Sequence, residues 1–327
     1  MGKHKTKAHG LAVRQETKVI ARESLLEKID EYISAGNIDL ATKTCEKLLK
    51  SNPRDVEVLD LYSELLINLG NYELAMKMIS ESIKIEPEIS ASKYLNFAQI
   101  SGNIELCVAA LEKGIEILLK QREIQLKEQN EALLFTLIQI GSAFSQKCEL
   151  FMNEPLCMRE DAEAICEAAM RSAVEFCPSS PEVLAQLASL KYVQSLAKLS
   201  QIEANEAQID AEMKEVVEII DSLKEMVQKA PEFAYETNLI LKIARLCIEP
   251  ALSLHEKALI FLEKGIEAND FEPEFHWLKA LILSQMNRFD EAIESLENYQ
   301  EICISNEIEI DANFEEILNN LKNNLQI

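Results

Sequence analysis

The sequence has little of what sheet proteins, membrane spans and disordered chains are made of. Its 327 residues include only eight glycines, eight prolines and 6% aromatic residues, whereas Leu, Ile, Glu, Ala and Lys dominate. This composition favours helix throughout. No apolar run approaches the roughly 18 residues that a membrane span requires, and the first residues lack the apolar core of a secretory signal. We therefore expect a soluble, all-α protein.

Residue patterns that carry catalysis or bind metal are also missing. The sequence has no glycine-rich phosphate loop, no nucleophile elbow and no pair of histidines spaced for one helical face. Neighbouring cysteines, of which there are eight in total, are at least nine residues apart, which argues against a close-paired zinc motif. We expect no enzymatic activity, no cofactor and no metal site, and we interpret the cysteines as free thiols in a reducing compartment.

Negative charge dominates the chain except at its start. The formal net charge is −23, whereas residues 1–22 contain six lysines or arginines and one glutamate, a net +5. The remaining 305 residues therefore carry −28. Such a field repels nucleic acid and membrane surfaces and attracts a basic partner, and it also fits plain solubility. We expect no direct contact with nucleic acid or with a membrane.

One pattern of residues occurs twice, at a spacing of 34 positions. Gly36-Asn37-Ile38, Ala41 and Pro53 are matched by Gly70-Asn71-Tyr72, Ala75 and Pro87. A period of 34 residues built from two helices is typical of the tetratricopeptide (TPR) repeat. The glycines fit the left-handed residue that ends a helix, the alanines a close approach of two helices, and the prolines the end of the second helix. Because one pair cannot bury its apolar face, the pattern predicts stacked pairs and a groove for a partner.

Similar markers continue along the chain and predict a right-handed α-solenoid of about seven TPR helix pairs. Gly102-Asn103-Ile104 and Asn287-Arg288-Phe289 repeat the turn, and residues 262–267 repeat the sequence of residues 111–116. We divide the chain into a basic flexible arm (1–21), the solenoid (22–304) and a C-terminal capping helix (305–327). Long stretches without glycine or proline predict extended helices between residues 115 and 230, with a break near residues 200–205.

Residues 132–146 are predicted to form a buried helix, because apolar side chains recur there at helical spacing. These side chains are Leu133, Leu134, Leu137, Ile138, Ile140 and Phe144. The predicted partner of this helix covers residues 162–176. An insertion that contains Pro155 separates the two.

The basic arm has three interpretations. Lysines and histidines without apolar periodicity are typical of a solvated tail, which is the simplest one. The lysines also permit a nuclear-import signal, although they do not form a block. Gly2 with Thr6 matches a loose pattern for N-myristoylation.

Candidate partner-binding residues follow from the repeat, because the first helix of each TPR pair lines the concave groove. Counting from the start of each repeat places these residues on that face: Glu23, Asp30, Glu57, Asp60, Glu64, Asn96, Gln99 and Trp277. The carboxylates would neutralise Lys and Arg of a partner, the amides would hydrogen-bond an extended backbone, and the aromatic side chain would anchor it. The alternatives are a solvated helix face for the carboxylates and core packing for Trp277.

Several features together resemble one family. They are the start Met1-Gly-Lys-His-Lys-Thr-Lys-Ala-His-Gly-Leu11, the regular repeats from Arg22, the acidic balance and the long irregular repeats of the second half. The chain looks like the TPR assembly chaperones dedicated to the fourth protein of the large ribosomal subunit. That resemblance implies a chaperone that binds this basic ribosomal protein soon after synthesis, keeps it soluble and escorts it to nuclear pre-ribosomes. We expect a monomer, located in cytoplasm and nucleus.

Two other functions stay open. A co-chaperone that holds the acidic tail of a heat-shock chaperone needs Lys, Asn and Arg at five places. Here those places contain Leu26, Asp30, Leu61, Ile89 and Lys93, so that only Lys93 agrees. The charge also has the wrong sign for a carboxylate ligand. A scaffold subunit of an RNA-processing complex would keep its partners at steady state, whereas an assembly chaperone would be absent from mature particles.

Overall fold

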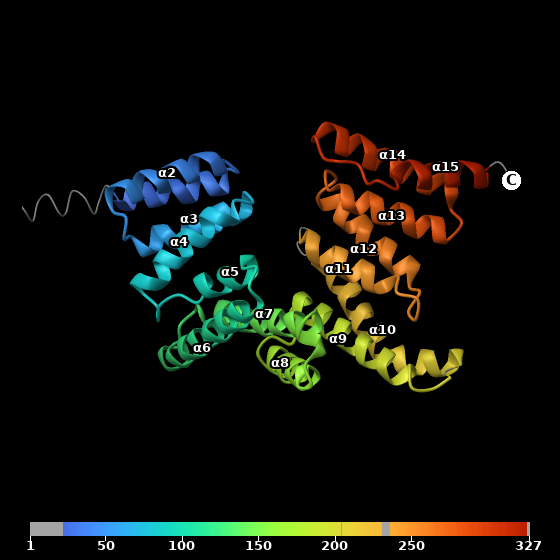
Figure 1. Cartoon of the computed structure of the whole chain (residues 1–327), viewed down its shortest axis with the longest axis horizontal. Helices are drawn as coiled ribbons and strands as arrows, with labels where there is room; N and C mark the ends of the chain where they lie inside the picture. The colour runs from blue at the N-terminus through green and yellow to red at the C-terminus, as the bar shows by residue number, and fades with distance from the viewer. Residues whose placement is uncertain (1–21, 204, 231–235, 326–327) are drawn as a thin grey trace, which may run out of the picture. The chain divides into compact units, whose positions relative to one another are not determined.

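The computed structural model describes residues 22–203, 205–230 and 236–325, so the predictions about the basic arm lie outside the described residues. All regular secondary structure in these ranges is helical, which confirms the predicted all-α class (Figure 1). The chain forms two compact units, Met1–Ala143 and Phe144–Ile327. Each unit is described by itself.

The N-terminal unit is a series of antiparallel helix pairs. Residues 22–34 form its first described helix. The others are α2 (Ile38–Ser51), α3 (Val56–Asn68), α4 (Tyr72–Ile85), α5 (Ser92–Ile100), α6 (Ile104–Glu128) and the first part of α7 (Leu133–Met152). From α2 to α6 each helix contacts the next, as stacked pairs require. The prediction that the second helix of the third repeat is extended is confirmed by the 25 residues of α6.

The turn chemistry of the first two repeats is as predicted. Gly36 and Gly70 have φ angles of +71° and +72°, in the left-handed region that only glycine adopts without strain. Ala41 and Ala75 are fully buried between helices. The helices α2 and α4 end at Ser51 and Ile85, two residues before the prolines that stop them.

The C-terminal unit continues the pairing with longer helices. It contains the second part of α7, the 3-10 helix η1 (Leu156–Met158), α8 (Ala162–Phe176), α9 (Pro181–Leu199), α10 (Glu206–Lys229), α11 (Thr237–Cys247), α12 (His255–Ala268), α13 (Pro273–Gln285), α14 (Phe289–Ser305) and α15 (Phe314–Leu325). The predicted break near residues 200–205 is confirmed, because α9 ends at Leu199 and α10 begins at Glu206. In the last pair, Asn287 has a φ angle of +59° and takes the left-handed position that glycine holds in the first repeats. The helix α15 packs on α14 with Phe314 buried.

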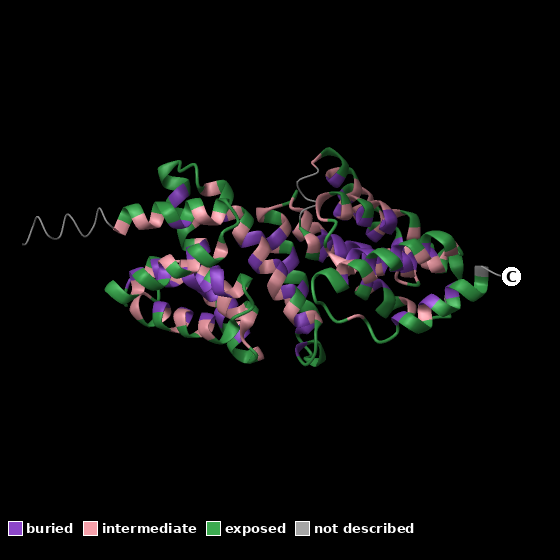
Figure 2. Ribbon diagram, turned by 90° about the horizontal axis from the view of Figure 1, so that it is seen from above, coloured by how far each residue is buried: buried purple, intermediate pink, exposed green. Residues whose placement is uncertain are grey.

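The prediction of a buried helix over residues 132–146 is wrong for its first two turns. The side chains of Leu134 and Ile138 are 69% and 44% exposed. The stripe that faces the protein interior contains Thr136, Ile140 and Ala143, which lie at helical spacing on another face of α7. Apolar residues occur on both faces here, so their spacing did not identify the buried one. Figure 2 shows how buried and exposed residues alternate along the helices.

The cysteines are all free, as predicted, and six of the eight are buried. Cys157 is exposed and Cys177 is half-buried. Within the described ranges, no cluster of three or more His, Cys, Asp or Glu side chains is arranged to hold a metal ion. No described helix combines the length and the apolar character that crossing a bilayer would need.

Candidate partner-binding site

The candidate site is a cavity of about 610 Å³ in the N-terminal unit. It opens where the helix of residues 22–34, the start of α3 and the loop between α4 and α5 come together. Its lining contains four carboxylates and two guanidinium groups, and consists of Arg22, Asn52, Arg54, Asp55, Val56, Glu57, Asp60, Glu86, Ile89 and Ser90. We call it the acidic cavity.

Arg22 occupies one wall of the acidic cavity. Its Nε lies 2.6 Å from one carboxylate oxygen of Asp55 and its Nη2 lies 2.8 Å from the other, and the same Nη2 also pairs with Glu57. Such a bidentate pair holds both partners in one geometry. Hydrogen bonding to the guanidinium lowers the pKa of Asp55, whose side chain is buried. The predicted partner-binding residue Glu57 therefore already has a cation beside it.

Asp60 also lines this cavity and belongs to a polar network. The hydroxyl of Ser82 donates to its carboxylate, and the Lys93 ammonium donates to the Ser82 hydroxyl over 3.3 Å. Burial raises the pKa of Asp60, although hydrogen bonds from Ser82 and Ser90 and the charge of Lys93 act in the opposite direction. The carboxylate is therefore fixed in place by its neighbours.

Lys93 itself is fully buried, and its ammonium makes hydrogen bonds inside the N-terminal unit. Besides Ser82 it donates to the main-chain carbonyl of Glu86 over 2.7 Å. Its ammonium therefore does not face solvent and cannot receive an acidic peptide tail. Lys93 was the one residue that matched the co-chaperone pattern, and its burial argues against a co-chaperone role.

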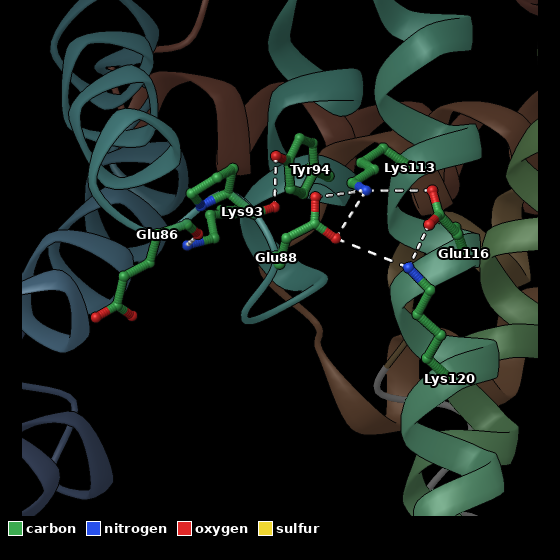
Figure 3. Close-up of polar contacts among 8 residues, drawn as sticks. Glu86, Glu88, Lys93, Tyr94, Lys113, Glu116 and Lys120 are labelled. Carbon is green, nitrogen blue, oxygen red and sulfur yellow. Dashed lines mark hydrogen bonds and ion pairs between the residues drawn. The ribbon is translucent and has the colours of Figure 1, made fainter.

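The α4–α5 loop that carries Glu86 is fastened from several sides (Figure 3). Lys93 holds the Glu86 carbonyl, and the Tyr94 hydroxyl donates to the Pro87 carbonyl over 2.8 Å. The Glu88 carboxylate pairs with Lys113 over 2.9 Å. In Figure 3 the carboxylate of Glu86 points away from these contacts, and Glu86 lines the acidic cavity.

Glu64 lies near both Asp60 and Asn96. Burial raises the pKa of Glu64, the charge of Asp60 raises it further, and the side chain of Asn96 lowers it. The side chain of Glu64 is exposed. The structure thus brings together Glu57, Asp60, Glu64 and Asn96.

The other predicted binding residues lie elsewhere. Glu23 and Asp30 are exposed on the helix of residues 22–34, and Gln99 is exposed on α5; none of the three lines the acidic cavity. Trp277 belongs to α13 of the other unit, where it is half-buried with its ring centroid 5.0 Å from that of Tyr299. This is core packing. The partner-binding role of all eight residues stays a prediction.

Sequence reasoning missed Arg22 as a member of the site, although a signal was present. Arg22 precedes Val56 by 34 residues, one repeat period, and α3 begins at Val56. Residues one period apart begin the first helices of neighbouring pairs and so lie side by side in a stacked array. An arginine in that register next to Asp55 and Glu57 predicts an ion pair across the repeat boundary. Nothing in the spacing pointed to Glu86, which is positioned by its loop.

The comparisons with known proteins agree on repeats and fold. Residues 56–89 and 273–303 match the model of the tetratricopeptide repeat. A solved structure of "Assembly Chaperone of RpL4 (Acl4)", residues 1–338, aligns with a TM-score of 0.63 at 19% identity, over 81% of this chain and 96% of that one. The APC/C heterotetramer Cut9–Hcn1 aligns with a TM-score of 0.51 at 11% identity, over 86% of this chain and 48% of that one. These similarities confirm the α-solenoid.

Two curated relatives confirm the resemblance predicted from the sequence. A Schizosaccharomyces pombe protein is 29% identical over 73% of this chain, and an Emericella nidulans protein is 27% identical over 82%. Both are named "Probable assembly chaperone of rpl4". Each alignment spans 66% of the relative's own length, so the chain covers just under two thirds of the curated relatives it matches.

Proposed function

We propose that this chain is a dedicated chaperone that binds a newly made basic protein of the large ribosomal subunit, the fourth one, and keeps it soluble until assembly. The observation that carries the proposal is the alignment, over most of the chain, with two proteins named as assembly chaperones of rpl4. The chain acts by binding and not by catalysis. It works as a monomer in cytoplasm and nucleus and escorts its client to nuclear pre-ribosomes.

The chemistry of the acidic cavity supports a basic client. Asp60 and Glu86 line the acidic cavity, and Glu64 lies close enough to Asp60 to feel its charge. Lys93 balances part of the charge of Asp60. Carboxylates gathered in this way attract the Lys and Arg side chains of a ribosomal protein, which would otherwise bind RNA phosphate. Each partly solvated pair contributes only about 0.2 to 1 kcal/mol, so affinity requires many such contacts.

A pull-down from cells tests the identity of the client. The tagged chain should recover one large-subunit ribosomal protein in stoichiometric amount, and mature ribosomes should lack the chain. A stable set of several proteins, retained on mature particles, would instead identify a scaffold subunit.

Neutral substitutions test Glu86 of the acidic cavity together with Glu64, which lies near Asp60, without reversing charge near Lys93. Glu64→Gln with Glu86→Gln should weaken binding of the recovered client by about 3- to 10-fold at low salt, since two partly solvated ion pairs are lost. Glu27→Gln with Glu123→Gln is the matched control, because both residues are exposed and neither lines the acidic cavity. Equal affinity of the two variants at low salt would show that the client binds elsewhere on the chain.

A further inference from the structure

Two guanidinium groups line the acidic cavity, those of Arg22 and Arg54, and Arg22 is bound to carboxylates of its lining. Arg22 places its guanidinium on Asp55 and, at the same time, on Glu57. Arg22 thereby neutralises part of the negative charge of these two carboxylates, which lie at the start of α3. Glu86 lines the same cavity and turns its carboxylate away from Lys113 and Lys120, which pair with Glu88 instead (Figure 3).

The segment that leads into Arg22 has the composition of a ligand for the rest of the cavity. Residues 1–21 contain four lysines and one arginine against one glutamate, a net +4, in a chain of net −23. Lys18 precedes Arg22 by four residues, so an extended chain can carry its ammonium up to about 14 Å along from that anchor. A segment tethered this closely reaches an effective concentration on the order of millimolar at its site.

We propose that residues 1–21 bind in the acidic cavity of the client-free chain, with Lys18 and Arg14 as the cations that face Asp60 and Glu86. The segment thereby acts as an internal competitor of the client. This inference rests on the proposed function, because it assigns the same cavity to the client. The acidic surface is then covered by the chain's own lysines until a client with more cations displaces them.

Competition within the chain also has a functional consequence. A polyanionic groove without a cover attracts any basic protein, whereas a groove with a tethered occupant admits only ligands whose summed attraction exceeds that of the tether. The tether thus raises specificity for a long basic client at the cost of affinity. Screening by salt removes both interactions alike.

The test compares three full-length proteins. The first is the native chain, and the second is an arm-neutral variant with Lys3→Gln, Lys5→Gln, Lys7→Gln, Arg14→Gln and Lys18→Gln. The third controls for total charge by neutralising five exposed lysines of the folded part: Lys28, Lys43, Lys47, Lys50 and Lys127. The probe is a fluorescent 20-residue peptide of lysine, arginine and glycine, and the readout is its anisotropy at low salt.

We expect the arm-neutral variant to bind the probe about 5- to 20-fold more tightly than the native chain, because a tethered competitor has been removed. The charge control should change affinity less than 2-fold, and the difference should vanish at about 0.5 M salt. A synthetic peptide of residues 1–21 should bind the arm-neutral variant, and Glu86→Gln should weaken that binding.

Two other outcomes overturn the inference in distinguishable ways. If native and arm-neutral chains bind the probe equally well, the arm does not compete, and the proposed function stands without it. If neither chain binds the probe at low salt, the acidic cavity takes no basic ligand. The cavity assignment of the proposed function then fails together with the inference.

Discussion

The helices α3 and α13 hold the same place in their repeats but present different chemistry there. In α3 the predicted groove positions are filled by Asp60 and Glu64, and burial raises the pKa values of both. In α13 the corresponding positions carry Trp277, which packs into the interior, and Leu281, which is half-buried. The same positions of a helix pair therefore carry charged residues in one unit and packed apolar residues in the other. Partner chemistry has to be derived for each repeat separately.

Replacing Trp277 with alanine tests whether this residue contributes to the core, and we expect it to change stability more than the other substitutions below. The indole ring lies against Tyr299 and the core of the C-terminal unit. Because the side chain is only half-buried, we expect the free energy of unfolding to fall by about 2 to 4 kcal/mol. Urea denaturation followed by circular dichroism measures this loss.

The matched substitution on α3 is Glu64→Ala, which should change stability by less than about 1 kcal/mol. Trp277 is the chain's sole tryptophan, so its fluorescence in the native protein also reports whether the client touches it. A stable Trp277→Ala protein with strongly weakened client binding would show that this residue is an anchor and not a core residue.

The two copies of Leu-Glu-Lys-Gly-Ile-Glu sharpen the comparison further. A Cβ added to Gly265 would lie 2.7 Å from the ring of Phe275, which is fully buried, and one added to Gly114 would lie 2.9 Å from the end of the half-buried Leu95 side chain. The leucine can turn away, whereas the ring cannot. Gly265→Ala should therefore cost about 1 to 3 kcal/mol of unfolding free energy.

At Gly114 the same substitution should cost much less, because alanine improves helix propensity by about 1 kcal/mol and so offsets a mild clash. Thermal unfolding of the two variants in parallel measures the difference. An equal loss at both glycines would mean that the two repeats pack alike and that the identity of the neighbouring side chain is unimportant.

The sequence predicts the repeat frame well because local rules determine it. Gly36 and Gly70 require a left-handed turn, and the alanines a close approach, so the first pairs follow from residues only a few positions apart. The exposed first turns of α7 were predicted wrongly, because Leu134 and Ile138 share the helical spacing of a buried stripe. Which face of a helix is buried depends on the neighbouring helices, and the spacing of apolar residues within one helix does not identify these.

The site was predictable only in part, for the same reason. The register placed Asp60 and Glu64 together correctly, since the residues of one helix face follow its period. It could not show that Lys93 is buried and donates to Ser82, the partner of Asp60, or that Glu86 lines the cavity. Those facts depend on contacts between different helices.

Two carboxylates of the acidic cavity should respond to acid in opposite directions, which is the smallest effect expected. Hydrogen bonding to Arg22 lowers the pKa of Asp55, so this group's contribution to stability is present above the unfolded pKa of about 3.9 and is lost as the pH falls through the folded pKa. Burial raises the pKa of Asp60, so the folded state takes up this proton before the unfolded state does. Its charge opposes folding at neutral pH and ceases to do so as the pH falls.

Melting temperatures between pH 7 and pH 4 separate the two groups. Relative to Asp60→Asn, the native chain should gain stability as the pH falls toward 4. Relative to Asp55→Asn, the native chain should lose stability at the lower end of this pH range and below it. The loss should be about 1 kcal/mol or less, because Arg22 is one-third exposed and solvent screens the pair. Only the slopes matter, since each substitution also shifts stability at neutral pH through Lys93 or Arg22. Parallel slopes for both variants would mean that the two carboxylates share one environment. The distinction between Asp55, which Arg22 neutralises, and Asp60, whose pKa burial raises, would then be wrong.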